Sequence, residues 1–374
     1  MISRLTICLL AALTTLGGCS PASGPAVRAA PAPSVAPRAS APAASAVAPA
    51  PNPATAIRHR LTGSGPDLVL VHGNFDRMET WDAVVPALSS SFRVLTLDLV
   101  GYGETRNPSG QYTIERLGEG VLEVMNAEAI QSAILVGNSM GGAVVSYVAG
   151  RAPDRVAALV LEDANFLPTR MLPEMEARLG PVLQAAVAWK QGPADASLHK
   201  ATREAVAEAL RLALPTKGAV TDKVIDHFTT GFDPKHVDAV LLGQREFDFS
   251  AVADGVLAAR KSKSFPVLVL WGSADPLLPV GAADAVQRKV QGARLVIFEG
   301  CGHAPHLERP ESFASSLRNA FGAGAGFPTQ DMLIGADGTG GKLEPGWLQT
   351  LAAKAPASEK TGANKRPKSP GQPQ

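Results

Sequence analysis

Six short, nearly continuous apolar runs recur along the middle of the chain. They cover residues 67–73, 93–99, 132–137, 156–161, 266–271 and 294–298. Runs of this length without polar alternation are typical of strands that are buried on both faces of a sheet. Segments with helical periodicity lie between them, at residues 79–88, 114–129, 140–150, 282–290 and 310–321. This alternation of strands and helices predicts a mostly parallel sheet covered by helices on both faces.

One long interval interrupts the alternation. Residues 167–263 contain no strand-like run, and their apolar positions follow a helical pattern. The helical patterns cover residues 174–189, 197–214 and 235–246. Because the interval follows the end of one buried strand, its helices should overhang that edge of the sheet. We therefore expect an α/β core over residues 57–166 and 264–323, with residues 167–263 inserted as a helical cap.

The first residues have the pattern of a bacterial export signal. Arg4 precedes an apolar run over residues 5–16, which is shorter than the roughly 17–25 residues that a membrane span needs. Residues 16–19 read Leu-Gly-Gly-Cys, which resembles the lipobox of bacterial lipoproteins. The resemblance implies removal of residues 1–18 and acylation of Cys19. It predicts an exported lipoprotein with a membrane anchor, at the periplasmic face of the outer membrane if the cell is Gram-negative. The alternative is an ordinary secretory signal in which Cys19 has no role.

The two flanking segments differ in composition from the middle of the chain. From residue 21 to 53 the chain is almost entirely Ala, Pro, Ser and Val. We therefore expect residues 19–56 to form an extended linker behind the lipidated cysteine, with a reach on the order of 100 Å. Residues 324–374 are rich in Gly, Ala, Lys and Pro, which favours a disordered tail, although residues 331–334 and 347–348 could form a small docking element.

Charge and cysteine content narrow the possible functions. The chain has 35 Lys and Arg against 34 Asp and Glu, and this balance argues against a nucleic-acid-binding protein. Removal of the signal takes Arg4 with it and leaves 34 basic and 34 acidic residues. Of the three cysteines, Cys8 leaves with the signal and Cys19 is expected to carry lipid. Cys301 is then alone, so no intramolecular disulfide can form.

A candidate nucleophile follows the third of the apolar runs. Residues 137–142 read Gly-Asn-Ser-Met-Gly-Gly and stand between a predicted strand and a predicted helix. A serine on such a tight turn is held in a strained conformation with its hydroxyl exposed above the sheet. Gly137 and Gly141 fit the two positions at which a side chain would collide with the turn. The strand–turn–helix context makes Ser139 a strong candidate for a catalytic nucleophile.

Residues 68–321 resemble the α/β-hydrolase family. Besides the serine turn, the matching motifs are His72-Gly73, Asp-Leu-Val-Gly-Tyr-Gly at 98–103, Trp-Gly-Ser-Ala-Asp-Pro at 271–276, and Gly-His-Ala-Pro-His-Leu-Glu-Arg-Pro at 302–310. The resemblance implies an eight-stranded, mostly parallel sheet, a helical cap and a Ser-Asp-His triad. The first strand or two of that sheet are not evident in the sequence.

The resemblance assigns the triad to Ser139, Asp275 and His303. A serine hydroxyl needs a base to take its proton, and the base needs an acid to hold its tautomer. His306 is an alternative base, although in this motif it more often packs beneath the loop. Asp163, at the end of an earlier strand, is an alternative acid. Cys301 lies on the histidine loop, and we expect a packed residue there and not a nucleophile.

The expected oxyanion hole consists of the backbone N–H groups of Asn74 and Met140. His72 is expected to position the loop, and Phe75 could form a wall of the pocket. Three further side chains are candidates for substrate contact or, equally, for packing: Arg77, Tyr102 and Trp189.

This set of residues predicts transfer of an acyl group to water through an acyl-enzyme. A carboxylic-ester hydrolase acting on a small molecule is the expected activity. One alternative is hydrolysis of carbon–carbon bonds in ring-cleavage products, but Asn74, Phe75 and Ala304 depart from the pattern of those enzymes. The other alternative is a non-catalytic, lipid-anchored binding protein on the same fold. We expect no metal and no cofactor, because there is neither a Cys/His cluster nor a phosphate-binding loop.

Overall fold

The structure is a computed structural model that describes residues 57–192, 195–232, 237–242 and 247–354. Contacts divide the chain into residues 1–49 and 50–374, and all of the described residues belong to the second unit. The predicted signal, Cys19 and the linker therefore lie outside the described residues. No helix in the described part has the length and apolar character that crossing a membrane requires.

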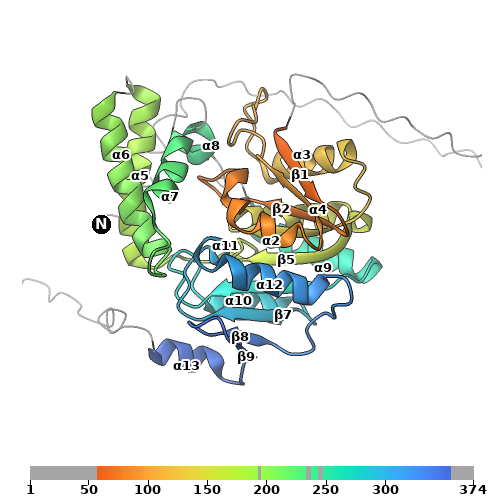
Figure 1. Cartoon of the computed structure of the whole chain (residues 1–374). Coiled ribbons are helices and arrows are strands. Elements are labelled where there is room, and N and C mark those ends of the chain that lie inside the picture. Colours follow the sequence, from red (N-terminus) through yellow and green to blue (C-terminus); the bar gives the residue numbers. More distant parts are fainter. Residues whose placement is uncertain (1–56, 193–194, 233–236, 243–246, 355–374) are drawn as a thin grey trace, which may run out of the picture. The chain divides into compact units, whose positions relative to one another are not determined.

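A nine-stranded sheet runs through the described residues, in the order β1-β3-β2-β4-β5-β6-β7-β8-β9 (Figure 1). Its strands are β1 (His59–Gly63), β2 (Asp67–Val71), β3 (Arg93–Leu97), β4 (Ala133–Asn138), β5 (Val156–Glu162), β6 (Val267–Gly272), β7 (Arg294–Phe298), β8 (Met332–Ile334) and β9 (Gly340–Lys342). All neighbours are parallel except β1 with β3 and β8 with β9. The mostly parallel α/β sheet of the α/β-hydrolase type is thus confirmed, with nine strands instead of eight.

Helices cover both faces of the sheet and enclose two apolar cores. One core lies under α3 (Ile114–Ala127), α4 (Met140–Arg151), α9 (Phe249–Ser262) and α10 (Gly281–Lys289). The other lies under α2 (Val85–Leu88) and α12 (Pro310–Phe321). Strands β2 and β4 are buried along nearly their whole length because side chains from both of their faces enter these cores.

The inserted cap consists of α5 (Pro173–Gln191), α6 (Ala196–Ala213), α7 (Asp222–Thr229) and α8 (Val237–Leu242), drawn in green in Figure 1. Short 3₁₀ segments precede α2 and follow α7, at η2 (Met78–Ala83) and η4 (Thr230–Phe232). The cap has an apolar core of its own, which includes Met175, Val206 and Phe232. This core gives the cap a packed interior, to which Ala304 of the histidine loop also contributes.

Four expectations about the elements need correction. Residues 79–88 form η2 and α2 instead of one helix, with Pro86 in the first turn of α2. Helix α9 was expected in the cap, but Val252 and Val256 are buried in the core of the sheet, and Gly150 of α4 approaches Gly255 closely. β1 was not evident, because its side chains are only half-buried and lack an apolar run.

The fourth correction concerns residues 324–374, which were expected to be a disordered tail. Residues 332–334 and 340–342 extend the sheet beyond β7, and α13 (Trp347–Lys354) follows them. Trp347 packs against the core of the sheet, as does Leu343. The two short segments proposed as a possible docking element are thus part of the folded domain.

The carboxyl ends of the parallel strands place the candidate site residues along one edge of the sheet. Gly73 and Asn74 follow β2, Ser139 follows β4, and the strand order reverses between these two strands. Asp275 comes after β6 and His303 after β7. In open α/β sheets ligands bind at this kind of reversal, beyond the carboxyl ends of the strands.

Candidate active site

Ser139 stands on a strained turn between β4 and α4. Its backbone has φ 51° and ψ −119°, a conformation that non-glycine residues rarely adopt. The glycines around it are needed for space: a Cβ on Gly137 would lie 2.2 Å from the Gly141 oxygen, and one on Gly141 would lie 2.3 Å from the Val71 oxygen. The Ser139 N–H donates to the Glu162 oxygen over 3.0 Å, which ties the turn to the end of β5.

His303 and Asp275 are joined by a hydrogen bond. The Nδ1–H group of His303 donates to Asp275 Oδ2 over 2.7 Å, and the other oxygen, Oδ1, accepts from the N–H groups of Leu277 and Leu278 over 2.8 and 3.1 Å. This arrangement leaves the Nε2 atom of His303 for a partner on its other side, as the tautomer of a catalytic base requires. Burial lowers the pKa of His303, but the Asp275 carboxylate outweighs it and holds the pKa above its ordinary value.

The alternative base, His306, lies fully buried beneath the histidine loop. Its Nδ1 and backbone N–H both reach the carboxylate of Glu162 over 2.9 Å, and its Nε2 lies 2.9 Å from Thr80 Oγ1. Its ring is tilted against that of Trp81 with 4.2 Å between centroids. Both ring nitrogens therefore have structural partners, and this geometry favours His303 as the base.

Asn138 links the nucleophile turn to the histidine loop. Its Nδ2 donates to the backbone oxygen of His303 over 3.1 Å and lies 3.4 Å from the Glu162 oxygen. The sequence argument missed this contact, although Asn138 stands inside the quoted serine motif. A polar side chain in an otherwise apolar strand was the available signal, because a buried amide needs partners.

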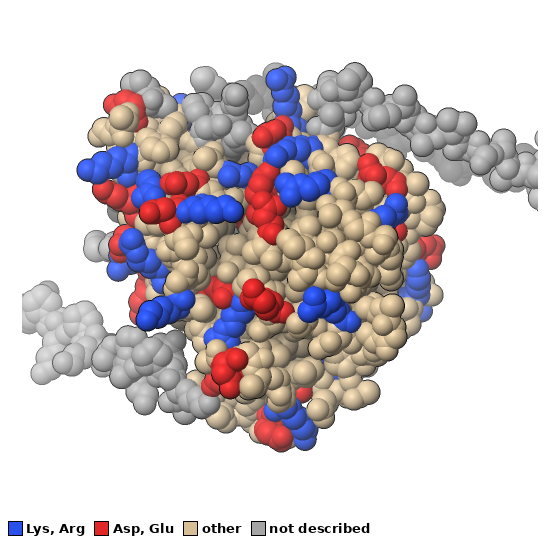
Figure 2. All heavy atoms as spheres, in the orientation of Figure 1, with Lys and Arg blue, Asp and Glu red and all other residues tan. Residues whose placement is uncertain are grey.

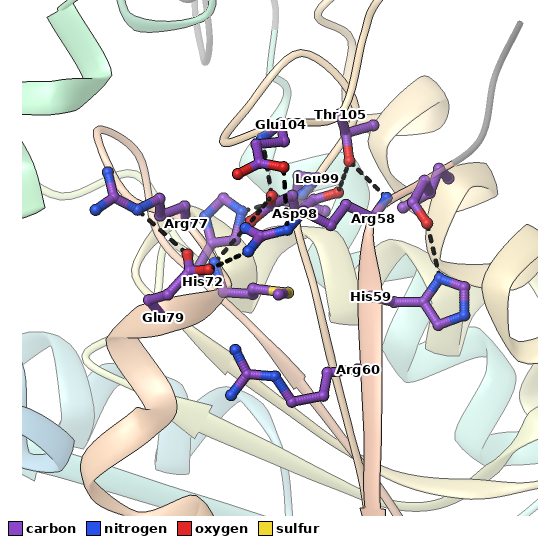
Figure 3. A network of polar contacts seen from close by, with 12 residues as sticks. Arg58, His59, Arg60, His72, Arg77, Glu79, Asp98, Leu99, Glu104 and Thr105 are labelled. Atoms are coloured by element: carbon purple, nitrogen blue, oxygen red, sulfur yellow. Dashed lines mark hydrogen bonds and ion pairs between the residues drawn. The ribbon is translucent and has the colours of Figure 1, made fainter.

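The loop of the expected oxyanion hole is held from below by a polar network (Figure 3). His72 accepts from the Leu99 N–H over 3.0 Å through Nε2, so its Nδ1 donates to the Gly73 oxygen over 2.8 Å. The buried Asp98 carboxylate accepts from the Met78 N–H over 2.8 Å and pairs with Arg58 over 3.2 Å. His72 therefore shapes the loop, and its ring nitrogens are not free for chemistry.

The side-chain oxygen of Asn74 has two hydrogen-bond donors. Its Oδ1 accepts from the Phe75 N–H over 3.1 Å and from the Tyr102 hydroxyl over 3.0 Å. Phe75 has φ 63°, and its ring lies 5.7 Å from that of Phe232 in the cap. A Cβ on Gly73 would lie 3.2 Å from the Cβ of Ser139, so this loop passes directly beside the nucleophile. Met140 opens α4, and the first N–H groups of a helix have no partner within the helix.

A profile of the alpha/beta hydrolase fold matches residues 66–310, which is more than half of the chain. The chain belongs to the α/β-hydrolase fold family. This α/β-hydrolase is 31% identical over 271 residues to a pimeloyl-[acyl-carrier protein] methyl ester esterase of Nitrosomonas europaea, covering 69% of this chain and 97% of the relative.

Solved structures give the same result for the fold. A thermophilic esterase from Thermogutta terrifontis aligns with a TM-score of 0.56 and 27% identity, over 70% of this chain and 91% of that one. A 2-hydroxy-6-oxo-6-phenylhexa-2,4-dienoate hydrolase from Rhodococcus sp. strain RHA1 aligns with a TM-score of 0.58 and 22% identity, over 70% and 93%. The second likeness concerns the fold alone.

In this α/β-hydrolase the cap forms hydrogen bonds and an ion pair with two loops of the core, the loop after β2 and the histidine loop. Asp76 pairs with His227 of α7 over 2.6 Å, and Arg77 donates to the His227 oxygen over 3.0 Å. At the histidine loop, the backbone N–H of His303 donates to the oxygen of Ala213, the last residue of α6, over 2.8 Å. The position of the cap is thus tied to both loops through backbone and ionic contacts.

Three side chains that were candidates for chemistry or substrate contact have packing partners instead. Tyr102 is buried, with its hydroxyl between Asn74 and the Ala239 oxygen, 3.1 Å away. Trp189 donates to Thr202 Oγ1 over 2.8 Å within the cap. Burial raises the pKa of the Cys301 thiol to about 12, so it is a poor nucleophile at neutral pH.

Asp163, Asp275 and His303 offer ligand-type atoms that lie within 4.8 Å of one another, the one such group of three found among the described residues. The donor set could coordinate a small cation. However, the Nδ1 of His303 and three of the acceptor positions on Asp275 and Asp163 are already taken by hydrogen bonds. These partners fit a catalytic dyad better than a metal site.

Proposed function

We propose that this α/β-hydrolase cleaves carboxylic esters through Ser139, His303 and Asp275. The observation that carries the proposal is the 2.7 Å hydrogen bond between His303 and Asp275, at the strand ends where Ser139 stands on its strained turn. The relative from Nitrosomonas europaea, which is named a methyl ester esterase, favours an ester substrate.

In the proposed reaction, His303 Nε2 takes the proton of the Ser139 hydroxyl as its oxygen attacks the ester carbonyl. The N–H groups of Asn74 and Met140 would hold the developing oxyanion, and Asp275 would stabilise the imidazolium. His303 then protonates the departing alcohol, which leaves an acyl-enzyme. Water, activated by the same histidine, releases the acid and restores the serine.

The loop after β2 favours an ester over a carbon–carbon bond. Phe75 is engaged with Phe232 and Asp76 with His227, so the loop carries an aromatic contact and an ion pair in place of the Ser/Gly-rich segment typical of carbon–carbon hydrolases. Turnover of a ring-cleavage dienone that exceeds turnover of every ester would reverse this choice.

Hydrolysis of p-nitrophenyl esters by the full chain in detergent tests the proposal. Ser139→Ala should lower kcat by about a thousandfold or more and abolish labelling by a fluorophosphonate. Ser90→Ala is the control, because Ser90 is exposed and its hydroxyl contacts the Ala87 oxygen and the Ser91 hydroxyl, away from the candidate triad in the sequence. Equal turnover by the parent and Ser139→Ala would refute the serine mechanism.

We also propose that Cys19 carries a lipid that anchors the enzyme at a membrane. The lipobox-like residues 16–19 support this, and so does the charge balance, with 34 basic and 34 acidic residues after removal of the signal. On the face drawn in Figure 2, Lys and Arg side chains are interspersed with Asp and Glu. That face offers no broad basic surface that would hold anionic lipid in place of an acyl anchor.

A further inference from the structure

A second carboxyl group lies beside the candidate catalytic acid. Asp163 directly follows β5, the strand that pairs with β6, and it is fully buried. Its backbone has φ 39°, which is unusual for a residue other than glycine. One carboxylate oxygen each of Asp163 and Asp275 and one ring nitrogen of His303 lie within 4.8 Å of one another. A buried acid on a strained backbone thus lies beside the His303–Asp275 pair.

The hydrogen bonds around the two carboxyl groups are unequal. Asp275 accepts three, from His303 and from the N–H groups of Leu277 and Leu278. Asp163 accepts one, from the Gly272 N–H to Oδ1 over 3.0 Å. Its other oxygen, Oδ2, is buried and has no hydrogen-bond donor among the residues that the structure describes.

This inequality decides which carboxyl is ionised. Two adjacent buried carboxylates cannot both keep their charge, so one of them retains a proton. Three donors stabilise the ionised form of Asp275, whereas an unpartnered oxygen on Asp163 would be costly as part of an anion. Burial, followed by the charges of Asp275 and Glu162, raises the pKa of Asp163 well above its ordinary value. The proton therefore belongs on Asp163.

The other ionisable groups nearby do not change this assignment. The carboxylate of Glu162 pairs with His306, with 2.9 Å between Glu162 Oε1 and His306 Nδ1. Glu308 accepts from the Gly302 N–H over 2.7 Å and the Thr216 N–H over 3.0 Å. His303 faces Asp275 with its Nδ1. The largest influences on the pKa of Asp163 are burial, the Asp275 and Glu162 carboxylates and the Gly272 N–H, with no Lys or Arg among them.

We propose that Asp163 is a positioning residue for catalysis, whose carboxyl stays protonated and donates a hydrogen bond from Oδ2 to the Asp275 carboxylate. This inference rests on the proposed function, because it assigns Asp275 as the catalytic acid. The bond would fix the plane of Asp275 against His303 and spread its negative charge. A carboxylate with spread charge raises the basicity of His303 less than an isolated one does.

Two substitutions separate this role from a structural one. Asp163→Asn keeps an acceptor for the Gly272 N–H and an N–H donor for Asp275, so it should retain kcat within about fivefold of the parent. Asp163→Ala loses the donor, and kcat on p-nitrophenyl esters should fall about 10- to 100-fold, with KM changed by less than about threefold. The acid limb of kcat/KM should move to higher pH in Asp163→Ala, because Asp275 then pulls more strongly on the His303 proton.

The acid limb also reveals the charge of Asp163. If Asp163 is an anion in the parent, both substitutions remove a negative charge near His303 and shift the acid limb to lower pH. That result would overturn the proposal. So would an Asp163→Ala variant with the kcat and acid limb of the parent.

A stability measurement tests the proton without any assay of activity. A carboxyl that is protonated when folded and ionised when unfolded costs the parent stability as pH rises above its unfolded pKa, about 3.9. Asp163→Asn avoids this cost, so its folding equilibrium constant relative to the parent should rise about tenfold per pH unit from about pH 4 to the folded pKa of Asp163. The control, Asp76→Asn, should show no such rise above about pH 4, because the pKa of Asp76 is lowered in the folded state and its contribution to stability changes only at lower pH.

These two measurements distinguish the possible failures. If the folding equilibrium constants of Asp163→Asn and the parent keep the same ratio at every pH, Asp163 is ionised when folded, and the proposal is wrong. If Ser139→Ala hydrolyses esters as fast as the parent while the tenfold slope is present, the proposed function is wrong but the proton on Asp163 stands. If Asp163→Ala does not fold, the slope and acid limb of Asp163→Asn still decide the charge.

Discussion

At the scale of single residues, the ion pair between Asp76 and His227 joins the loop after β2 to the cap. Asp76 is buried, and its Oδ1 accepts from both His227 Nε2 over 2.6 Å and the Arg77 N–H over 2.7 Å. Burial alone would raise the pKa of Asp76, but His227 outweighs it and lowers that pKa. A buried carboxylate with such partners adds stability only while it is ionised.

We expect Asp76→Asn to lower the free energy of unfolding by about 2 kcal/mol at pH 7, the usual worth of hydrogen bonds to a charged group. Because the folded pKa of Asp76 is depressed, this contribution is present above the unfolded pKa and is lost as pH falls through the folded pKa. Denaturant unfolding at pH 7 and at successively lower pH measures it. Asp82→Asn is the control, since Asp82 forms an exposed pair with Arg60, and it should change stability by less than about 1 kcal/mol. A loss that does not shrink in acid would contradict the ion-pair interpretation.

Residue identity predicted some features of the site and not others. Ser139, Asp275 and His303 could be named because each belongs to a motif that is contiguous in the sequence. The difference in hydrogen bonding between Asp275, which has three donors, and Asp163, whose Oδ2 has none among the described residues, could not be predicted. It depends on loops that follow different strands and meet only in the folded sheet. The link from Asn138 to the His303 oxygen is of the same kind.

At the scale of elements, buried strands and helices with one apolar face were the easiest to predict. The expected ranges 294–298 and 310–321 coincide with β7 and α12. Residues 249–262 were assigned to the cap without a helix of their own, and they form α9 against the core of the sheet, because composition alone does not say which surface a segment will meet. β8 and β9 were missed as strands because three residues are too short for a periodic pattern, and β9 contains two glycines.

The C-terminal hairpin and helix protect an edge of the sheet. β8 pairs with β7, and Asp331 accepts from the Leu295 N–H over 3.0 Å and from Gln287 Nε2 over 2.8 Å. Arg309 donates to the Gly335 oxygen over 2.7 Å, and Trp347 packs on the core. An uncovered strand edge exposes unpaired backbone groups and promotes aggregation.

We therefore expect a chain that ends at Gly326 to lose about 3 kcal/mol or more of unfolding free energy, since it no longer buries the apolar side chains of β8 and α13. It should also aggregate more readily on heating. Thermal unfolding followed by circular dichroism and light scattering measures both effects. A chain that ends at Lys354 is the control, because the contacts given above all precede Ala355. Equal melting of the two truncated chains would show that the C-terminal elements add no stability.

At the scale of the whole molecule, the enzyme domain and its proposed means of attachment are separate along the chain. The family match covers residues 66–310, whereas the proposed anchor is at Cys19. The intervening linker is rich in Ala and Pro, a composition that acts as a semi-rigid spacer. Attachment and catalysis should then be separable by single substitutions.

Cys19→Ser tests that separation. The full chain should sediment with membranes and resist release by high salt, because acyl chains and not charges would hold it. Cys19→Ser should lose acyl labelling and appear in the soluble fraction, with ester turnover per molecule within about twofold of the parent, since the substitution lies outside the family match at 66–310. Cys8→Ser is the matched control and should remain at the membrane, because Cys8 would leave with the signal. Membrane association and acyl labelling that persist in Cys19→Ser would exclude this anchor, whatever the esterase activity.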